Sequence, residues 1–269
     1  MFYNIALVAV SVMWCANFAQ AQKFLKGMDT YKRSTLGAEY LVPITTTNPS
    51  VPVLDMKSPD MACRAGNQTL SAPKILEVAS SDILYLTFDL ENRPYNATAL
   101  MKDANIWGPC MVYMAPAKPS VDNKYKWFKI YEWAGDKDQW CSEKIVTNDG
   151  VLAVPMKQFL KSDTYVIRAE IIGLNMAEKA NSENSQLGAQ FYPSCGMIKY
   201  TNEESTVMAG GNNGVPVGVP FPGYYKENHP ALKLDIMTTK ALTYPSKMAA
   251  LGPPEYDPPA VAHDGGSVA

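Results

Sequence analysis

The side chains able to do chemistry are few, and histidine is the scarcest of them. The sequence has two histidines, His229 within Asn228-His229-Pro230 and His263 near the C-terminus. A Ser-His-Asp or Cys-His arrangement needs an imidazole base, and imidazole-based zinc or copper sites need at least two close together. These two lie 34 residues apart, with no cysteine or carboxylate pattern beside them. We therefore interpret both as loop residues.

Carboxylates and glycine-rich segments give weaker signals. Glu132 and Glu170 lie on strand-like segments and could be the paired acids of a glycoside hydrolase, but solvated strand faces explain them more simply. The run Gly210-Gly211-Asn212-Asn213-Gly214 has no helix after it, as a phosphate-binding loop requires. It is typical of a flexible linker.

Aromatic residues are the remaining chemical signal, because Phe, Trp and Tyr make up 10% of the chain. Exposed rings suit stacking against the C–H bonds of a sugar face. The alternative for any single ring is packing in the core or against a loop. The aromatic residues in expected loops are Trp107, Trp133, Trp140, Tyr224, Tyr225, Tyr244 and Tyr256.

The N-terminus and the cysteines both indicate the secretory route. Residues 1–21 have the pattern of a signal peptide, with a short apolar run and the cleavage site Ala19-Gln20-Ala21, so Gln22 would begin the mature chain. Cys15 leaves with this peptide, and the four remaining cysteines allow two disulfides in three connectivities. Those four are Cys63, Cys110, Cys141 and Cys195. The sequons at Asn67 and Asn96 predict N-glycosylation.

Composition assigns the rest of the chain to the globular proteins. The 269 residues are 47% hydrophobic and 19% charged, which argues against disorder. Because 24 basic residues nearly balance 26 acidic ones without forming a run, we expect no nucleic-acid partner. No second apolar stretch follows the signal sequence, so we also expect no membrane anchor.

The elements that must position these residues are mostly short strands. We expect strands at 83–88, 110–114, 127–131, 165–172, 190–200 and 232–236, separated by long polar connections. Val166, Arg168 and Glu170 alternate with apolar neighbours, which predicts one core face and one solvent face. The pattern favours an all-β sandwich domain over residues 22–250, followed by a flexible Pro/Gly-rich tail over 251–269.

The order of motifs resembles that of a known family. The motifs are VLDMKSPDMACR at 53–64, WGPCMVYMA at 107–115, WFKIYE at 127–132, YVIRAEIIGL at 165–174, GAQFYPSC at 188–195 and VPFPGYYK at 219–226. The chain is similar to fungal lytic polysaccharide monooxygenases of auxiliary activity family nine, formerly glycoside hydrolase family sixty-one. The resemblance implies an immunoglobulin-like or fibronectin-like β-sandwich. It also implies a disulfide between Cys63 and Cys195, and hence a second between Cys110 and Cys141.

The resemblance also implies where a copper ion would bind. Members of the family hold copper through an N-terminal histidine, a second histidine and an axial tyrosine. In this sequence the two histidine positions hold Gln22 and Ile106, while Asn175 replaces a further histidine that helps to position oxygen. Gln190 and Tyr192 match the family's glutamine and axial tyrosine. Because an amide is a far weaker copper ligand than imidazole and isoleucine is none, we expect no cofactor.

Three functions remain open from the sequence. We expect a secreted, monomeric, monooxygenase-like protein that has lost copper-dependent oxidation and binds a polysaccharide or a cell-wall or surface partner. The first alternative is an active copper-dependent monooxygenase that cleaves cellulose or related β-glucans with an atypical metal site. The second is a structural or signalling protein of the wall that recognises another protein.

Overall fold

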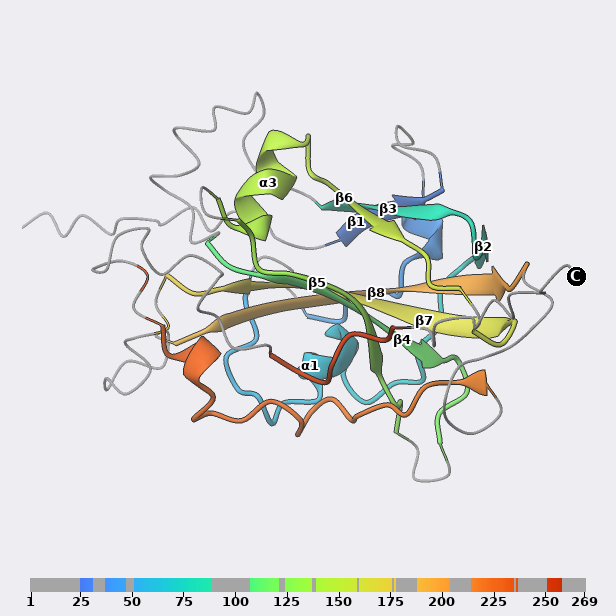
Figure 1. Cartoon of the computed structure of the whole chain (residues 1–269). Helices are drawn as coiled ribbons and strands as arrows, with labels where there is room; N and C mark the ends of the chain where they lie inside the picture. Colours follow the sequence, from blue (N-terminus) through green and yellow to red (C-terminus); the bar gives the residue numbers. More distant parts are fainter. Residues whose placement is uncertain are drawn as a thin grey trace, which may run out of the picture.

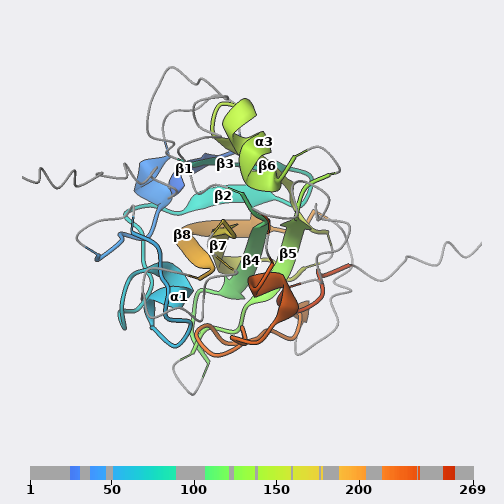
Figure 2. The same cartoon turned by 90° about the vertical axis from the view of Figure 1, so that its left-hand side faces the viewer.

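The protein folds into two β-sheets that lie face to face, as the views in Figures 1 and 2 show. The computed structural model describes residues 25–30, 37–46, 51–88, 107–120, 124–136, 139–158, 160–175, 177, 188–203, 214–234, 236 and 251–257. The smaller sheet has the order β1-β3-β6, and the larger has the order β2-β8-β7-β4-β5. This arrangement confirms the predicted all-β sandwich.

Most strands and helices are short. The longest strands are β7 and β8, which are neighbours in the larger sheet. The smaller sheet contains β1 (Leu25–Asp29), β3 (Ile83–Phe88) and β6 (Val151–Pro155). The larger contains β2 (Leu76–Ala79), β4 (Cys110–Pro116), β5 (Phe128–Trp133), β7 (Asp163–Gly173) and β8 (Gln190–Thr201). Helices α1 (Asp60–Cys63) and α3 (Cys141–Thr147) and the 3-10 turns η1 (Ala38–Tyr40) and η4 (Pro230–Leu232) lie in the connections. None of the helices in the described ranges is long and apolar enough to span a bilayer.

The larger sheet is buried on both faces. Tyr165, Ile167 and Ala169 of β7 pack in the core between the sheets. The opposite face of β7 is covered by α1 and by the segment around 219–226, which lie below the sheet in Figure 1. Arg168 and Glu170 are therefore 0% and 1% exposed. The predicted solvent face of β7, and the solvated position given to Glu170, are wrong because connections far away in sequence cover that face.

Both implied disulfides are confirmed. Cys63 and Cys195 join α1 to β8 with their Cα atoms 5.4 Å apart. Cys110 and Cys141 join the start of β4 to the start of α3 with their Cα atoms 5.7 Å apart. Each bridge therefore fastens a short helix to the larger sheet.

The strand expected at 232–236 is wrong. Its first residue, Leu232, ends the 3-10 turn η4, which begins at Pro230. Proline favours the first position of a helical turn because it has no N–H to donate. The residues after the turn belong to no strand of the described part of the chain.

The flexible tail expected over 251–269 is wrong for its first seven residues. Leu251 is buried, and its carbonyl accepts a hydrogen bond from Lys129 Nζ at 2.7 Å. The Tyr256 N–H donates to the Lys129 carbonyl at 2.7 Å, and Glu255 pairs with Lys157 at 2.6 Å. Residues 251–257, which we call the C-terminal strap, are therefore packed along β5 (red in Figure 1).

Candidate functional site

Gln190 and Tyr192, which are expected to match the family's glutamine and axial tyrosine, lie together at the start of β8. Tyr192 pairs with Ile171 of β7, and Gln190 pairs with Gly173, where β7 ends. Being two residues apart on a strand, the two side chains share a face. The Tyr192 hydroxyl donates to Gln190 Oε1 at 3.1 Å, and both residues are buried. The pair is thus already hydrogen-bonded within the protein.

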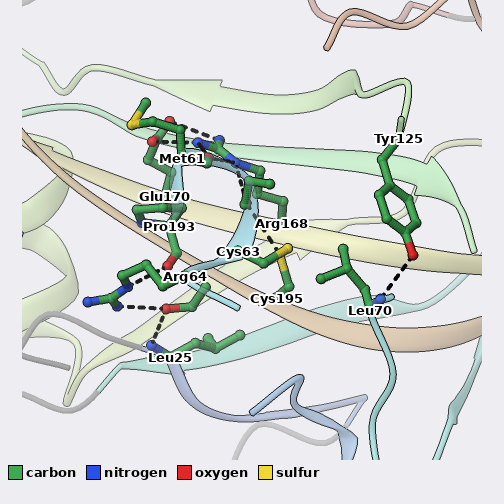
Figure 3. Close-up of a disulfide and its surroundings, with 12 residues drawn as sticks. Leu25, Met61, Cys63, Arg64, Leu70, Tyr125, Arg168, Glu170, Pro193 and Cys195 are labelled. Atoms are coloured by element: carbon green, nitrogen blue, oxygen red, sulfur yellow. Dashed lines mark hydrogen bonds and ion pairs between the residues drawn. A yellow bond between two sulfur atoms is a disulfide. The ribbon is translucent and has the colours of Figure 1, made fainter. Parts of the chain in front are cut away.

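Arg64 approaches this pair from the end of α1. Its Nε donates to the Pro193 carbonyl at 2.9 Å, and its Nη2 donates to Ser194 Oγ at 3.2 Å (Figure 3). Ser194 Oγ also accepts from the Leu25 N–H at 3.2 Å, which brings the start of β1 to the same place. Arg64 directly follows Cys63, so the disulfide of Cys63 fixes the position from which the Arg64 side chain reaches Ser194.

Burial and charge set the protonation of this cluster. Burial raises the pKa of Tyr192 well above its usual range, although the nearby Arg64 charge opposes the shift. Burial also lowers the pKa of Arg64 to about 10, with Tyr192 and Asp60 opposing. At neutral pH the cluster is therefore a neutral phenol beside a cationic guanidinium.

Asn175 supports the loop that contains Trp107. Asn175 Oδ1 accepts from the Trp107 N–H at 3.1 Å, and the Leu174 N–H donates to the Trp107 carbonyl at 2.8 Å. The next residue, Gly108, approaches β7 so closely that a Cβ there would lie 1.7 Å from the Ile172 carbonyl oxygen. Asn175 therefore acts as a loop anchor in this structure.

Other predicted site residues are placed elsewhere or not at all. His229 caps η4, where its Nδ1 accepts from the Ala231 N–H at 3.2 Å. Asn67 is exposed in the turn after α1. Within the described ranges no three His, Cys, Asp or Glu side chains cluster as metal ligands would. Predicted residues outside the described part of the chain are Gln22, Asn96, Ile106, Tyr244, His263 and the glycines at 210 and 211.

Of the two roles left open for the aromatic residues, sugar stacking or packing, the described rings fit packing. Trp140 and Tyr225 are buried in the core of the larger sheet's outer face. Trp107, Trp133, Tyr224 and Tyr256 are half-buried. The strongly exposed large apolar residues in the described segments are Val51, Ile75, Ile83 and Val217, and none of these is aromatic. Packing therefore explains these rings better than sugar stacking.

A buried polar network on β7 was missed by sequence reasoning. Arg168 binds Glu170 through two hydrogen bonds of 2.7 and 3.0 Å and also donates to the Met61 carbonyl at 2.8 Å (Figure 3). The Tyr225 hydroxyl donates to Glu170 Oε2 at 2.7 Å and lies 2.8 Å from the Tyr113 hydroxyl. The sequence signal that could have revealed this network is the pair of opposite charges, Arg168 and Glu170, in the otherwise apolar run 165–172. The network joins α1 and the 219–226 segment to the sheet.

The comparisons with known proteins agree on one family. The model of Auxiliary Activity family 9 (formerly GH61) matches residues 18–244. The chain is 32% identical over 219 residues to AA9 family lytic polysaccharide monooxygenase A of Emericella nidulans, across 78% of this chain and 35% of that protein. It is 29% identical over 232 residues to AA9 family lytic polysaccharide monooxygenase E of Neurospora crassa, across 82% of this chain and 64% of that protein. This chain thus spans about a third of one relative and somewhat under two thirds of the other.

Solved structures share the fold. CvAA9A superposes with a TM-score of 0.65 at 23% identity, covering 87% of this chain and 98% of that chain. A cellulose-active polysaccharide monooxygenase from M. thermophila superposes with a TM-score of 0.58 at 20% identity, covering 88% of this chain and 99% of that chain. These likenesses support the architecture derived above from the strands.

Proposed function

The chain belongs to Auxiliary Activity family 9, and from this premise we propose that it is a secreted protein that binds polysaccharide without copper-dependent oxidation. The polysaccharide, of the cellulose type or another wall component, is suggested by the names of its relatives. Fold alone does not carry an activity, so the loss of oxidation is argued from the residues that remain.

The observation that carries the proposal is the hydrogen-bonded Gln190–Tyr192 pair beside the buried cation Arg64. Gln190 Oε1 is used by the Tyr192 hydroxyl, and Tyr192 is held as a neutral phenol. A guanidinium near the phenol oxygen disfavours a second cation there, because like charges repel strongly in a buried site. The hydrogen bonds of these three side chains are thus made to other groups of the protein, which leaves them poorly suited to hold a metal ion.

The donor set does not fit the family's copper site. Copper(II) prefers imidazole and amine nitrogen ligands. The positions of the two histidine ligands hold Gln22 and Ile106, and the first histidine of the sequence is His229, which caps η4. A neutral amide and a protonated phenol are poor substitutes, so we derive no copper-dependent step.

Copper titration by calorimetry tests the proposal, using secreted protein whose mature N-terminus has been sequenced. We expect Gln22 or its cyclised form at the terminus. We also expect no binding of one copper ion per chain with a sub-micromolar dissociation constant. The matched variant Gln22→His/Ile106→His restores two imidazoles and should gain such binding. If the unmodified protein binds one copper ion with a sub-micromolar dissociation constant, the proposal is wrong.

Polysaccharide binding needs its own measurement. We expect the protein to sediment with at least one of insoluble cellulose, chitin or β-glucan, and to elute as a monomer in gel filtration. Release of soluble oxidised oligosaccharides with copper and a reductant would instead favour the active monooxygenase, which the retained Gln190 and Tyr192 keep as a second candidate. Failure to bind all three materials would favour recognition of another protein.

The secretory features predicted from the sequence remain part of the proposal. They are cleavage after Ala21 and glycosylation of Asn67 and Asn96. Asn67 is exposed, as an occupied sequon must be. Peptide mapping of the secreted protein before and after enzymatic removal of N-glycans would reveal which asparagines are modified.

A further inference from the structure

A cavity of about 340 Å³ lies beside the first residues of β8. Val53 lines the cavity and is bonded through its backbone to Phe191 of β8, so this wall is fixed to the sheet. Arg64, which donates hydrogen bonds to Pro193 and Ser194 of β8, lines the cavity as well. The volume falls at the lower end of the range for small-molecule sites and can hold one sugar ring.

The polar groups of the cavity are held in defined positions. Asp55 Oδ1 accepts from the Lys57 N–H at 2.8 Å, and Asp60 Oδ1 accepts from the Gly66 N–H at 3.1 Å. Both carboxylates are thereby oriented through one oxygen each. Asp55 is exposed and Asp60 is half-buried, so a ligand in the cavity can reach both carboxylates.

The charges of the lining select a neutral ligand with many hydroxyl groups. An anion would be attracted by Arg64 but repelled by Asp55 and Asp60, whereas a cation would meet the reverse. Sugar hydroxyls can donate hydrogen bonds to the two carboxylates without placing a charge near Arg64, which is itself fully buried. The aliphatic side chains of Val51 and Val53 offer an apolar wall to the C–H face of a ring.

We propose that this cavity is a binding subsite for one pyranose ring of a neutral polysaccharide. The inference rests on the proposed function, because it names the place where that polysaccharide contacts the protein. Recognition there needs neither copper nor an exposed aromatic platform. It uses the 51–60 segment, whose position is set by its backbone pairing to β8 and by the Cys63–Cys195 bridge.

Titration of cellotetraose, chitotetraose or laminaritetraose into isotope-labelled protein tests the subsite by amide chemical shifts. We expect saturable shifts within 51–64 for at least one of them. Asp55→Asn, which removes a charged acceptor from an exposed residue, should weaken binding at least about tenfold. Val51→Trp should abolish binding by filling the cavity, and because Val51 is 48% exposed this variant should still fold.

Glu77→Gln is the matched control, since Glu77 is an exposed carboxylate on β2 and does not line the cavity. It should bind like the unmodified protein. The absence of saturable shifts in 51–64 with all three sugars, or shifts that Asp55→Asn and Val51→Trp leave unchanged, would overturn the subsite.

Sedimentation with insoluble polysaccharide separates this inference from the proposed function. If the unmodified protein and Val51→Trp sediment equally well, the subsite is wrong and polysaccharide binding stands. If the unmodified protein sediments and Val51→Trp does not, both are supported. If the unmodified protein neither sediments nor binds the soluble sugars, both fail.

Discussion

At the scale of single residues, the most consequential charges are the ones that the fold buries. Arg168 and Glu170 have fully buried side chains, and removing such ions from water is costly unless their hydrogen bonds are made. Here the carboxylate receives bonds from Arg168 and Tyr225, while the guanidinium also reaches the Met61 carbonyl. The pair therefore specifies how α1 and the 219–226 segment sit on β7.

Arg168→Met should lower the free energy of unfolding by about 3–5 kcal/mol, because it leaves the Glu170 carboxylate buried without its cation. Adding Glu170→Gln should recover part of that loss, since the amide needs no counter-ion. Lys161→Met removes a half-exposed cation near the start of β7, 3.9 Å from Asp163, and should change stability by less than about 1 kcal/mol. Urea denaturation measures all three, and an Arg168→Met loss as small as that of Lys161→Met would contradict this account.

At the scale of elements, the Glu143 side chain accepts a hydrogen bond at the N-terminus of α3. Glu143 Oε2 accepts from the Trp140 N–H at 2.6 Å, which ties the side chain to the residue before the helix. Burial, the larger cause, and the nearby charge of Asp136 raise the pKa of Glu143 above its ordinary value of 4.5, while the bond from Trp140 opposes the shift. The helix start is thus sensitive to proton concentration.

Because the folded-state pKa of Glu143 is raised, protonation stabilises the fold below the unfolded-state value near 4.5. That contribution is lost as pH rises through the folded-state pKa. The difference in unfolding free energy between the unmodified protein and Glu143→Gln should therefore fall as pH rises above about 4.5 and then level off. Glutamine keeps a hydrogen-bond acceptor at this position. Urea denaturation from pH 4 to 7 measures the difference, and a constant or rising value would refute the assignment.

At the scale of the whole molecule, the two disulfides close loops of very different length. Cys63 and Cys195 are separated by 132 residues, and Cys110 and Cys141 by 31. A longer closed loop restricts the unfolded chain more. The long bridge therefore constrains the assembly of the sandwich, whereas the short bridge mainly fixes α3.

Replacing both cysteines of either bridge with alanine should destabilise the protein by about 2–5 kcal/mol. Loss of the Cys63–Cys195 bridge should cost about 1 kcal/mol more than loss of the other, from loop length alone. Denaturant unfolding of the two double variants gives this comparison. The reverse order would mean that packing around α3 outweighs chain entropy.

The sequence predicted most of this assembly where the signal was local. The runs at 83–88 and 190–200 are rich in β-branched and aromatic residues, which pack well on a pleated surface, and both are strands. The Gln190–Tyr192 pair could also be expected, because a spacing of two puts side chains on the same face of a strand. The resemblance to a family supplied the disulfide pairing, which residue counting had left open.

The parts that were missed depend on contacts between distant segments. Nothing local shows that Arg64 turns from α1 toward Ser194, 130 residues away, or that other segments cover Arg168. The alternating pattern of β7 was interpreted as one face on the core and one face in water. In the structure, α1 and the 219–226 segment cover the second face. The C-terminal strap is rich in proline and glycine, and its attachment depends on Lys129, which no local pattern connects to it.

The C-terminal strap has a practical consequence for handling the protein. Lys129 Nζ is fully buried, with Glu132 and the Leu251 carbonyl as its acceptors. A chain cut at residue 250, where composition suggests that the domain ends, would lose one of them and expose an edge of β5. A purification tag or a fused reporter should therefore be attached beyond Asp257, so that the C-terminal strap stays packed along β5.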